Sequence, residues 1–144
     1  MIISTMTVSY CGDLLGGIQK LTDGYRLALY DDDSGLSHRT THYATDGESN
    51  GAGYPPGGFR LERPAVGHVG HTVFLRFDNV MVDVSNINPV ACLMYNASKE
   101  NRSVAVMELL VTNTTDGRVL IPSPDLSISM VDNGFGSFAD EPVS

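Results

Sequence analysis

The fold is decided by residues 90–110, which read VACLMYNASKENRSVAVMELL. Two strongly apolar runs, Val90–Tyr95 and Val104–Leu110, flank a segment whose Asn and Ser residues favour a turn. This pattern predicts a β-hairpin with a loop of about seven residues that brings Lys99 and Arg102 to one tip. Because Val90–Tyr95 is apolar on both faces, it is either a central strand or a strand that a partner covers.

Further short runs of β-forming residues surround this hairpin. In Tyr25–Tyr30, large apolar residues alternate at a period of two until an acidic turn follows at residues 31–35. Leu126–Val131 alternates with serines, as expected for a strand with one solvated face. The remaining predicted strands are Gly58–Arg63, Thr72–Phe77 and Val80–Val84. Several short strands separated by turn residues predict an all-β fold, either an antiparallel β-sandwich or a jelly roll.

Two segments differ from this strand pattern. In Cys11–Leu21 the leucines and the isoleucine fall on one helical face, which predicts a short N-terminal helix despite the pair Gly16-Gly17. Residues 31–58 are rich in Gly, Asp, Ser, Thr and Pro and are predicted to form a long loop excursion, with Tyr43 and Tyr54 as isolated aromatics. Loops of this length are uncommon and are usually functional.

The chain is expected to form one domain with two arms, since 144 residues are too few for two well-built domains. The β-sandwich domain is predicted to span residues 11–132. Residues 1–10 form an N-terminal arm and residues 133–144 a C-terminal arm, which only Phe135 and Phe138 can anchor. In an assembly, such arms become ordered by adding a strand to a neighbour or by docking an aromatic side chain on it.

The composition excludes several classes of partner. The chain carries 9 Lys and Arg against 17 Asp and Glu, for a net charge of −8, and no block is basic, so we expect no nucleic-acid partner. No apolar run has the length of a membrane helix and no secretion signal is recognised, so we expect a soluble protein made in a cytoplasm, with no membrane partner. Cys11 and Cys92 are too few for a disulfide framework and are expected to be reduced.

Metal-binding patterns are weak. Asp31–Gly35 resembles the start of a calcium loop, but that loop requires Gly at its sixth position and Glu at its twelfth, where this chain has Leu36 and His42. The pairs His38/His42 and His68/His71 lie in segments predicted to be loops and lack the helical frame of a zinc site. We therefore expect no metal and no cofactor.

Patterns for catalysis are equally unspecific. The chain has no Gly-x-Ser-x-Gly elbow, and Cys92 lies inside an apolar strand, where a thiol is buried rather than nucleophilic. Asp46 and Glu48 could form the carboxylate pair of a carbohydrate hydrolase, but any acidic chain offers such pairs. The sequence therefore favours a protein that is not an enzyme.

Two stretches resemble a family of small virion proteins encoded in the structural modules of tailed bacteriophages. The first stretch contains Leu27-Ala28-Leu29-Tyr30, Thr41-x-Tyr43, Gly47-Glu48, Gly51-x-Gly53-Tyr54 and Gly57-Gly58-x-x-Leu61. The second, more specific stretch contains Ala91-x-x-Met94-Tyr95-Asn96-x-Ser98-x-x-Asn101-Arg102-Ser103-Val104-Ala105-Val106. The resemblance covers residues 25–110, and some members of the family are similar to capsid decoration, or cement, proteins of short-tailed phages, which have jelly-roll-like β folds.

The resemblance implies a non-enzymatic virion protein that decorates and stabilises the assembled capsid by bridging major capsid protein subunits. Such a protein is made in the host cytoplasm, lies on the outer capsid surface and forms a homo-oligomer on the particle. The alternative is a tail, collar or baseplate component or a fibre adaptor in host attachment, and a carbohydrate hydrolase ranks below both. The residues expected to bind a partner are Tyr43, Tyr54, Lys99, Arg102, Phe135 and Phe138.

Overall fold

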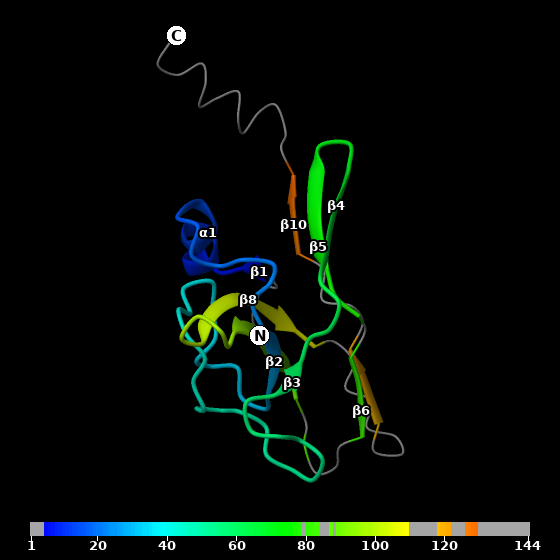
Figure 1. Cartoon of the computed structure of the whole chain (residues 1–144). Coiled ribbons are helices and arrows are strands. Elements are labelled where there is room, and N and C mark those ends of the chain that lie inside the picture. The colour runs from blue at the N-terminus through cyan, green and yellow to red at the C-terminus, as the bar shows by residue number, and fades with distance from the viewer. Residues whose placement is uncertain are drawn as a thin grey trace.

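The computed structural model describes residues 5–78, 80–83, 87, 89–109, 118–121 and 126–129. These residues are mostly β, in antiparallel sheets with one short helix, which confirms the predicted all-β fold (Figure 1). The arrangement is consistent with a sandwich and does not establish a jelly roll. In chain order the elements are β1 (Thr5–Met6), α1 (Val8–Leu15), β2 (Tyr25–Tyr30), β3 (Phe59–Arg60), β4 (Ala65–Val69), β5 (Thr72–Arg76), β6 (Val80–Asp83), β7 (Ala91–Asn96), β8 (Arg102–Glu108), β9 (Arg118–Ile121) and β10 (Leu126–Ser129).

The largest sheet has five strands in the order β1-β8-β7-β2-β3. Its centre is the predicted hairpin, in which Ala91 of β7 pairs with Glu108 of β8 and the register shifts between Met94 and Tyr95. The connection between Asn96 and Arg102 is shorter than expected. β2 pairs with β7 along its full length, so the run of residues 90–95 forms a central strand, one of its two predicted alternatives.

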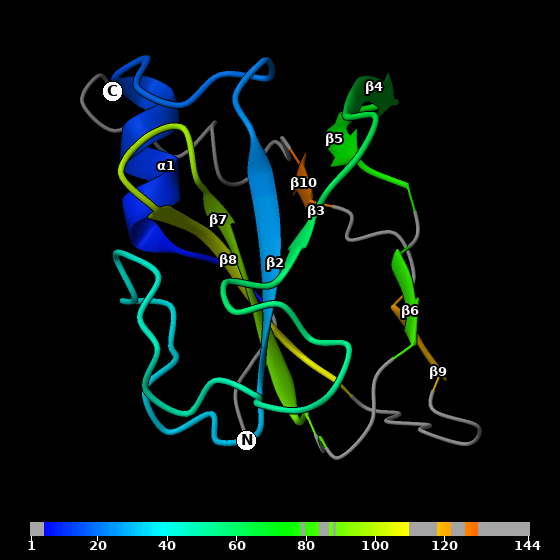
Figure 2. The same ribbon diagram turned by 60° about the horizontal axis from the view of Figure 1, so that its bottom comes forward.

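Both faces of this central sheet are buried. On one face Leu27, Leu29 and Met94 belong to a core cluster completed by residues of the second sheet, including Leu126. On the other face, a second cluster is completed by side chains of the long loop between β2 and β3. Its members are Ala28, Tyr30, Leu36, Ala91, Leu93, Tyr95, Val106 and the partly buried Tyr43. Figure 2 draws this loop in cyan and green. The second sheet and the long loop of the same chain thus bury one face of β7 each.

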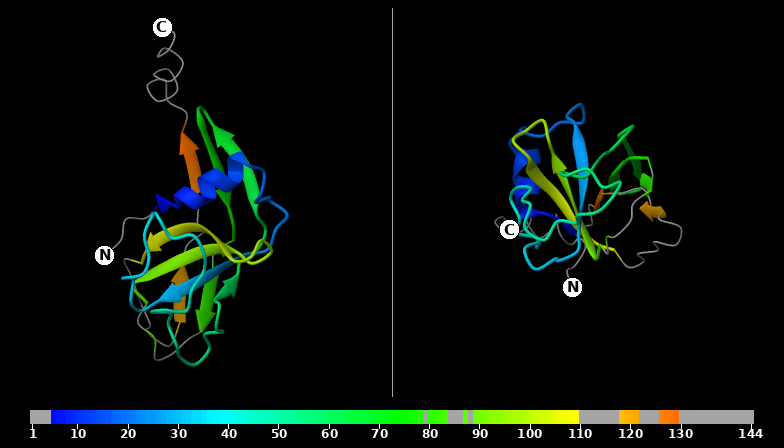
Figure 3. Two further views of the ribbon diagram at one scale, coloured as in Figure 1. Left: turned by 90° about the vertical axis from the view of Figure 1, so that its left-hand side faces the viewer. Right: turned by 90° about the horizontal axis from the view of Figure 1, so that it is seen from below.

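Two smaller sheets complete the described fold (Figure 3). One has three strands in the order β10-β5-β4, and the other pairs β6 with β9. β4 and β5 are joined by the two-residue turn Gly70-His71, in which Gly70 has a φ of 59°. A positive φ at the first turn residue is typical of a tight hairpin and favours glycine. The predicted strand Leu126–Val131 is present as β10, and its last two residues lie outside the described part of the chain.

The helix lies earlier in the chain than predicted: it covers Val8–Leu15 rather than Cys11–Leu21. It begins here because the Thr7 hydroxyl accepts a hydrogen bond from the backbone N–H of Tyr10, at 3.2 Å, and caps the helix. The helix ends at the glycine pair that weakened the prediction. Within the expected arm of residues 1–10, residues 5–10 thus lie in β1 and the first turns of α1, while the C-terminal arm lies outside the described residues.

Candidate functional site

The two cations at the tip of the β7–β8 hairpin are paired with buried carboxylates. Lys99 Nζ lies 3.0 Å from Asp23 Oδ1, and Arg102 NH1 lies 3.2 Å from Asp13 Oδ1. Only 9% of the Asp23 side chain and 8% of the Asp13 side chain are exposed, compared with about a third of each cation. The predicted position of Lys99 and Arg102 at one tip is therefore correct, but each cation is engaged within the chain.

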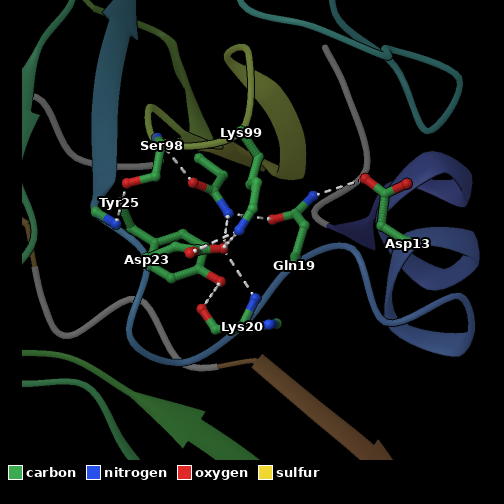
Figure 4. Close-up of polar contacts among 9 residues, drawn as sticks. Asp13, Gln19, Lys20, Asp23, Tyr25, Ser98 and Lys99 are labelled. Carbon is green, nitrogen blue, oxygen red and sulfur yellow. Dashed lines mark hydrogen bonds and ion pairs between the residues drawn. The ribbon is translucent and has the colours of Figure 1, made fainter.

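Two buried amides link these ion pairs into one network, and Figure 4 shows its part from Asp13 through Gln19 to Asp23 and Lys99. Gln19 Nε2 donates to Asp13 Oδ2 at 2.9 Å, and Asn96 Nδ2 donates to both Gln19 Oε1 and Asp23 Oδ2, at 3.1 and 2.8 Å. Asn96 Oδ1 in turn accepts the backbone N–H of Ser98. The network holds the segment that follows α1 against the hairpin.

The network keeps Asp23 ionised. Burial alone would raise the pKa of this carboxyl, but hydrogen bonds from Asn96, the Lys20 backbone N–H and Lys99, together with the charge of Lys99, lower it below its usual range. An ionised, fully partnered carboxylate of this kind anchors structure and has no free oxygen for proton transfer to a substrate. We refer to Asp13, Gln19, Asp23, Asn96, Lys99 and Arg102 as the polar network.

A second polar cluster fixes the long loop. Glu48 accepts hydrogen bonds from the hydroxyls of Tyr43 and Tyr54 and from the backbone N–H of Gly57, the first at 2.6 Å and the last at 2.9 Å. The Tyr54 hydroxyl also accepts the backbone N–H of Leu29, on the edge of β2 that β3 leaves unpaired. Burial and the neighbouring carboxylate raise the pKa of Tyr43 and Tyr54 above its ordinary value.

The two tyrosines predicted to bind a partner therefore have internal contacts. The Tyr43 ring stacks on Tyr95 with a centroid distance of 4.6 Å, and Tyr54 is 7% exposed and packs edge-on against Phe59. They do not form an open ligand groove in this conformation. Phe135 and Phe138, the other two predicted contacts, lie outside the described residues.

The weak metal and catalytic patterns gain no support from the geometry. No group of three or more His, Cys, Asp or Glu side chains with the spacing of a metal site occurs in the described ranges. All four histidines are exposed, and His68 lies in β4 rather than in the predicted loop. Burial raises the pKa of the Cys92 thiol to about 12, which disfavours the thiolate that a nucleophile requires. Asp46 is exposed, while its neighbour Glu48 is bound by the two tyrosines.

The surface feature that sequence reasoning missed is an apolar groove between the helical segment and the second sheet. Its cavity of about 220 Å³ is lined on one side by residues of 6–25 and on the other by β4, β5 and β10. The lining residues include Tyr10, Leu14, Leu21, Val66, Val73 and Leu75. Leu21 and Val66 are 42% and 60% exposed, so these apolar walls face solvent.

Other apolar side chains outside the groove lining are exposed as well. Leu15 at the end of α1 is 93% exposed, and Ile18 and Val69 are also exposed. Leu14, Leu15, Ile18 and Leu21 carried a detectable signal, because their spacing predicted one apolar helical face. The structure ends the helix at Leu15, so Ile18 and Leu21 lie on the irregular segment that follows, and Leu21 lines the groove.

Comparisons with family models, with curated proteins and with solved structures find no match to this chain. Within the described residues, no helix has the length and apolar character needed to cross a membrane.

Proposed function

We propose that the protein is a non-enzymatic structural component of a phage virion, which decorates the assembled capsid and stabilises it by bridging major capsid protein subunits. The observation that carries the proposal is the exposed apolar groove between the helical segment and the β4–β5 hairpin. A solvent-facing groove with apolar walls gains free energy when another polypeptide covers it. The expected occupant is an apolar surface segment of the major capsid protein.

The remaining polar chemistry of the domain supports a binding role. The carboxylates of the polar network and Glu48 are held by hydrogen bonds within the chain. Among the described residues, every buried side-chain nitrogen and oxygen has a hydrogen-bond partner. Polar side chains whose hydrogen bonds are all made within the chain hold the surface in a fixed shape and take no part in a reaction. A decorating protein requires such a rigid surface.

Decoration works by mass action. A protein that binds the assembled shell but not the free subunit stabilises the shell by an amount that grows with its concentration. The net charge of −8 suits an outer position, because an acidic protein is repelled by packaged DNA. No step in this mechanism requires a reacting group or a cofactor.

The proposal is tested by measuring how groove variants bind isolated phage capsids. Leu21→Asp and Val66→Asp each place a charge on an exposed apolar wall and are expected to weaken binding about tenfold or more, since an unpaired charge opposes desolvation of the contact. Val8→Asp is the matched control, because Val8 is 64% exposed on α1 but does not line the groove. Equal binding by all three variants would contradict the proposal.

Counting copies separates decoration from the tail alternative. Quantification against the major capsid protein in purified virions should give hundreds of copies of a decorating protein. A tail, collar, baseplate or fibre-adaptor protein would instead be present in a few to a few dozen copies. New reducing ends after incubation with cell-surface polysaccharide would favour the hydrolase.

A further inference from the structure

The outer edge of β4 is an unprotected hydrogen-bonding edge. β4 is the last strand on its side of the three-stranded sheet, and within the described residues no strand pairs with its outer side. Natural edge strands are usually blunted by lysine, by an internal proline or by a bulge, because an open edge is a template for another strand. β4 reads AVGHV, pairs in unbroken register with β5 and has none of these protections.

The tight turn fixes which backbone groups point outward. Val69 and Thr72 flank the two-residue turn Gly70-His71 and form a hydrogen-bonded pair, and bonded pairs alternate along an antiparallel ladder. Ala65, Gly67 and Val69 therefore bond to β5. The N–H and C=O groups of Val66 and His68 point away from β5, toward the open edge.

We propose that a second copy of the chain pairs with this edge, β4 against β4, around a twofold axis at Gly67. The two outward-facing residues, Val66 and His68, are placed symmetrically about Gly67. Antiparallel pairing about that point sets Val66 of one copy opposite His68 of the other, which satisfies both outward groups of each residue in a ladder of about four hydrogen bonds. Centring the pair on Val66 would instead place His68 opposite Pro64, which has no N–H to donate.

The side chains are compatible with this register. Gly67 at the axis has no side chain, so the two backbones can approach closely. The Phe74 ring of the same chain packs against Gly67, and a Cβ added there would lie 2.8 Å from the nearest ring atom. The flanking pairs set Ala65 opposite Val69, of which Val69 is 72% exposed. No Asp, Glu, Lys or Arg lies in β4, so the pairing opposes no like charges in an otherwise acidic chain.

The pairing deepens the oligomer part of the proposed function. A twofold axis perpendicular to the sheet joins two three-stranded sheets into one continuous sheet and leaves both apolar grooves on the same side. A dimer with two grooves on one side can contact two neighbouring capsid subunits at once, so its second contact is intramolecular and strengthens overall binding. The surface contributed by β4 is small, so the dimer in free solution is expected to be weak.

The first test measures molar mass against protein concentration by sedimentation equilibrium. The wild-type chain should shift from 15.5 kDa toward twice that mass as concentration rises. His68→Pro removes an outward N–H that β5 does not use and should weaken association about tenfold or more, since each copy loses a donor and meets the proline ring. His68→Ala keeps the N–H and should associate like the wild type.

A second test remains informative if His68→Pro fails to fold. In a Cys11→Ser background, the double variant Ala65→Cys/Val69→Cys places thiols opposite each other only in the proposed pair. Within one chain these positions are about 13 Å apart along the strand, too far for a disulfide. Mild oxidation should give a covalent dimer, whereas Val69→Cys alone should not, because its copies lie about 13 Å apart across the axis.

The outcomes are distinguishable from those of the proposed function. A chain that stays monomeric and gives no cross-link, or a dimer that His68→Pro does not weaken, would overturn the pairing. If that monomer still bound capsids, the decoration role would stand. If Val66 and His68 became protected from amide exchange on the capsid while the Ala65→Cys/Val69→Cys variant bound there gave no cross-linked dimer, a capsid strand, not a second copy, would occupy the edge.

Discussion

Replacing Glu48 by alanine should release the long loop from the central sheet. Glu48 accepts the hydroxyls of Tyr43 and Tyr54 and the N–H of Gly57, and a hydrogen bond to a charged group contributes about 1.5–3 kcal/mol. Because Glu48 is half-buried, we take about 1 kcal/mol for each bond, the typical net contribution of a hydrogen bond in general. The expected loss is about 3 kcal/mol, a large share of the stability of a domain of this size.

Urea unfolding monitored by circular dichroism measures this loss. With a slope of about 1–3 kcal/mol per molar urea, 3 kcal/mol lowers the midpoint by about 1–3 M. Asp46→Ala is the matched control, because Asp46 is an exposed carboxylate on the same loop and its removal should change the free energy of unfolding by less than about 0.5 kcal/mol. If Glu48→Ala unfolded at the same midpoint as Asp46→Ala, the carboxylate would not be holding the loop and the reasoning would be refuted.

Three further perturbations test the internal contacts. Burial raises the pKa of Tyr30 and Tyr43, so their ionisation opposes folding, and the free energy of unfolding should fall as the pH rises above about 10. Urea titrations at a series of pH values measure this fall, and a free energy of unfolding that does not change with pH in this range would count against it. The pKa of Asp23 is lowered in the folded state, so its ionised carboxylate stabilises the fold above the unfolded pKa near about 3.9, and this stabilisation is lost as the pH falls through the folded pKa. Asp23→Asn should therefore make the free energy of unfolding less sensitive to acid in the same titrations. An unchanged acid profile would show that the carboxylate is not stabilising. Gly58 has a φ of 88°, and an added Cβ would lie 2.0 Å from a β2 carbonyl oxygen, so Gly58→Ala should lower the free energy of unfolding by more than about 2 kcal/mol. Gly12 lies in α1 with open space around it, so Gly12→Ala should raise the free energy of unfolding by about 0.5–1 kcal/mol. Similar melting temperatures for the two variants would contradict this.

The parts of the fold that were predicted from sequence depend on local signals. The β7–β8 hairpin was predicted because two apolar runs flank a segment of turn residues, and Asn96 does form a local turn by accepting the Ser98 N–H. β2 was predicted by its period-two pattern, and the loop from residue 31 to 58 by its composition. In each case the sequence near the element contains the reason for it.

The parts that were not predicted depend on distant contacts. β4 was missed because Gly67 and Gly70 weaken a strand pattern, yet the first leaves room for the Phe74 ring and the second makes the turn. The helix boundary was wrong because the apolar spacing continued past Leu15, while the cap at Thr7 came earlier.

The candidate site illustrates the same limit. Lys99 and Arg102 were correctly placed at one tip, but their carboxylate partners lie 76 and 89 residues away in sequence, and nothing local connects them. The groove was also missed, because its two walls, residues 6–25 and residues of β4, β5 and β10, come from segments that are far apart in sequence. One wall did carry a local signal, the apolar spacing that includes Leu14 and Leu21, but no single stretch indicates a groove that two distant segments form together.

The most direct measurement of the central claim is the position of this chain in a cryo-electron reconstruction of the intact virus particle. Density for the domain should lie on the outside of the shell in many symmetric copies, with the apolar groove facing the capsid surface. Density confined to the tail, or a groove that faces solvent while another surface contacts the shell, would contradict adhesion through the groove.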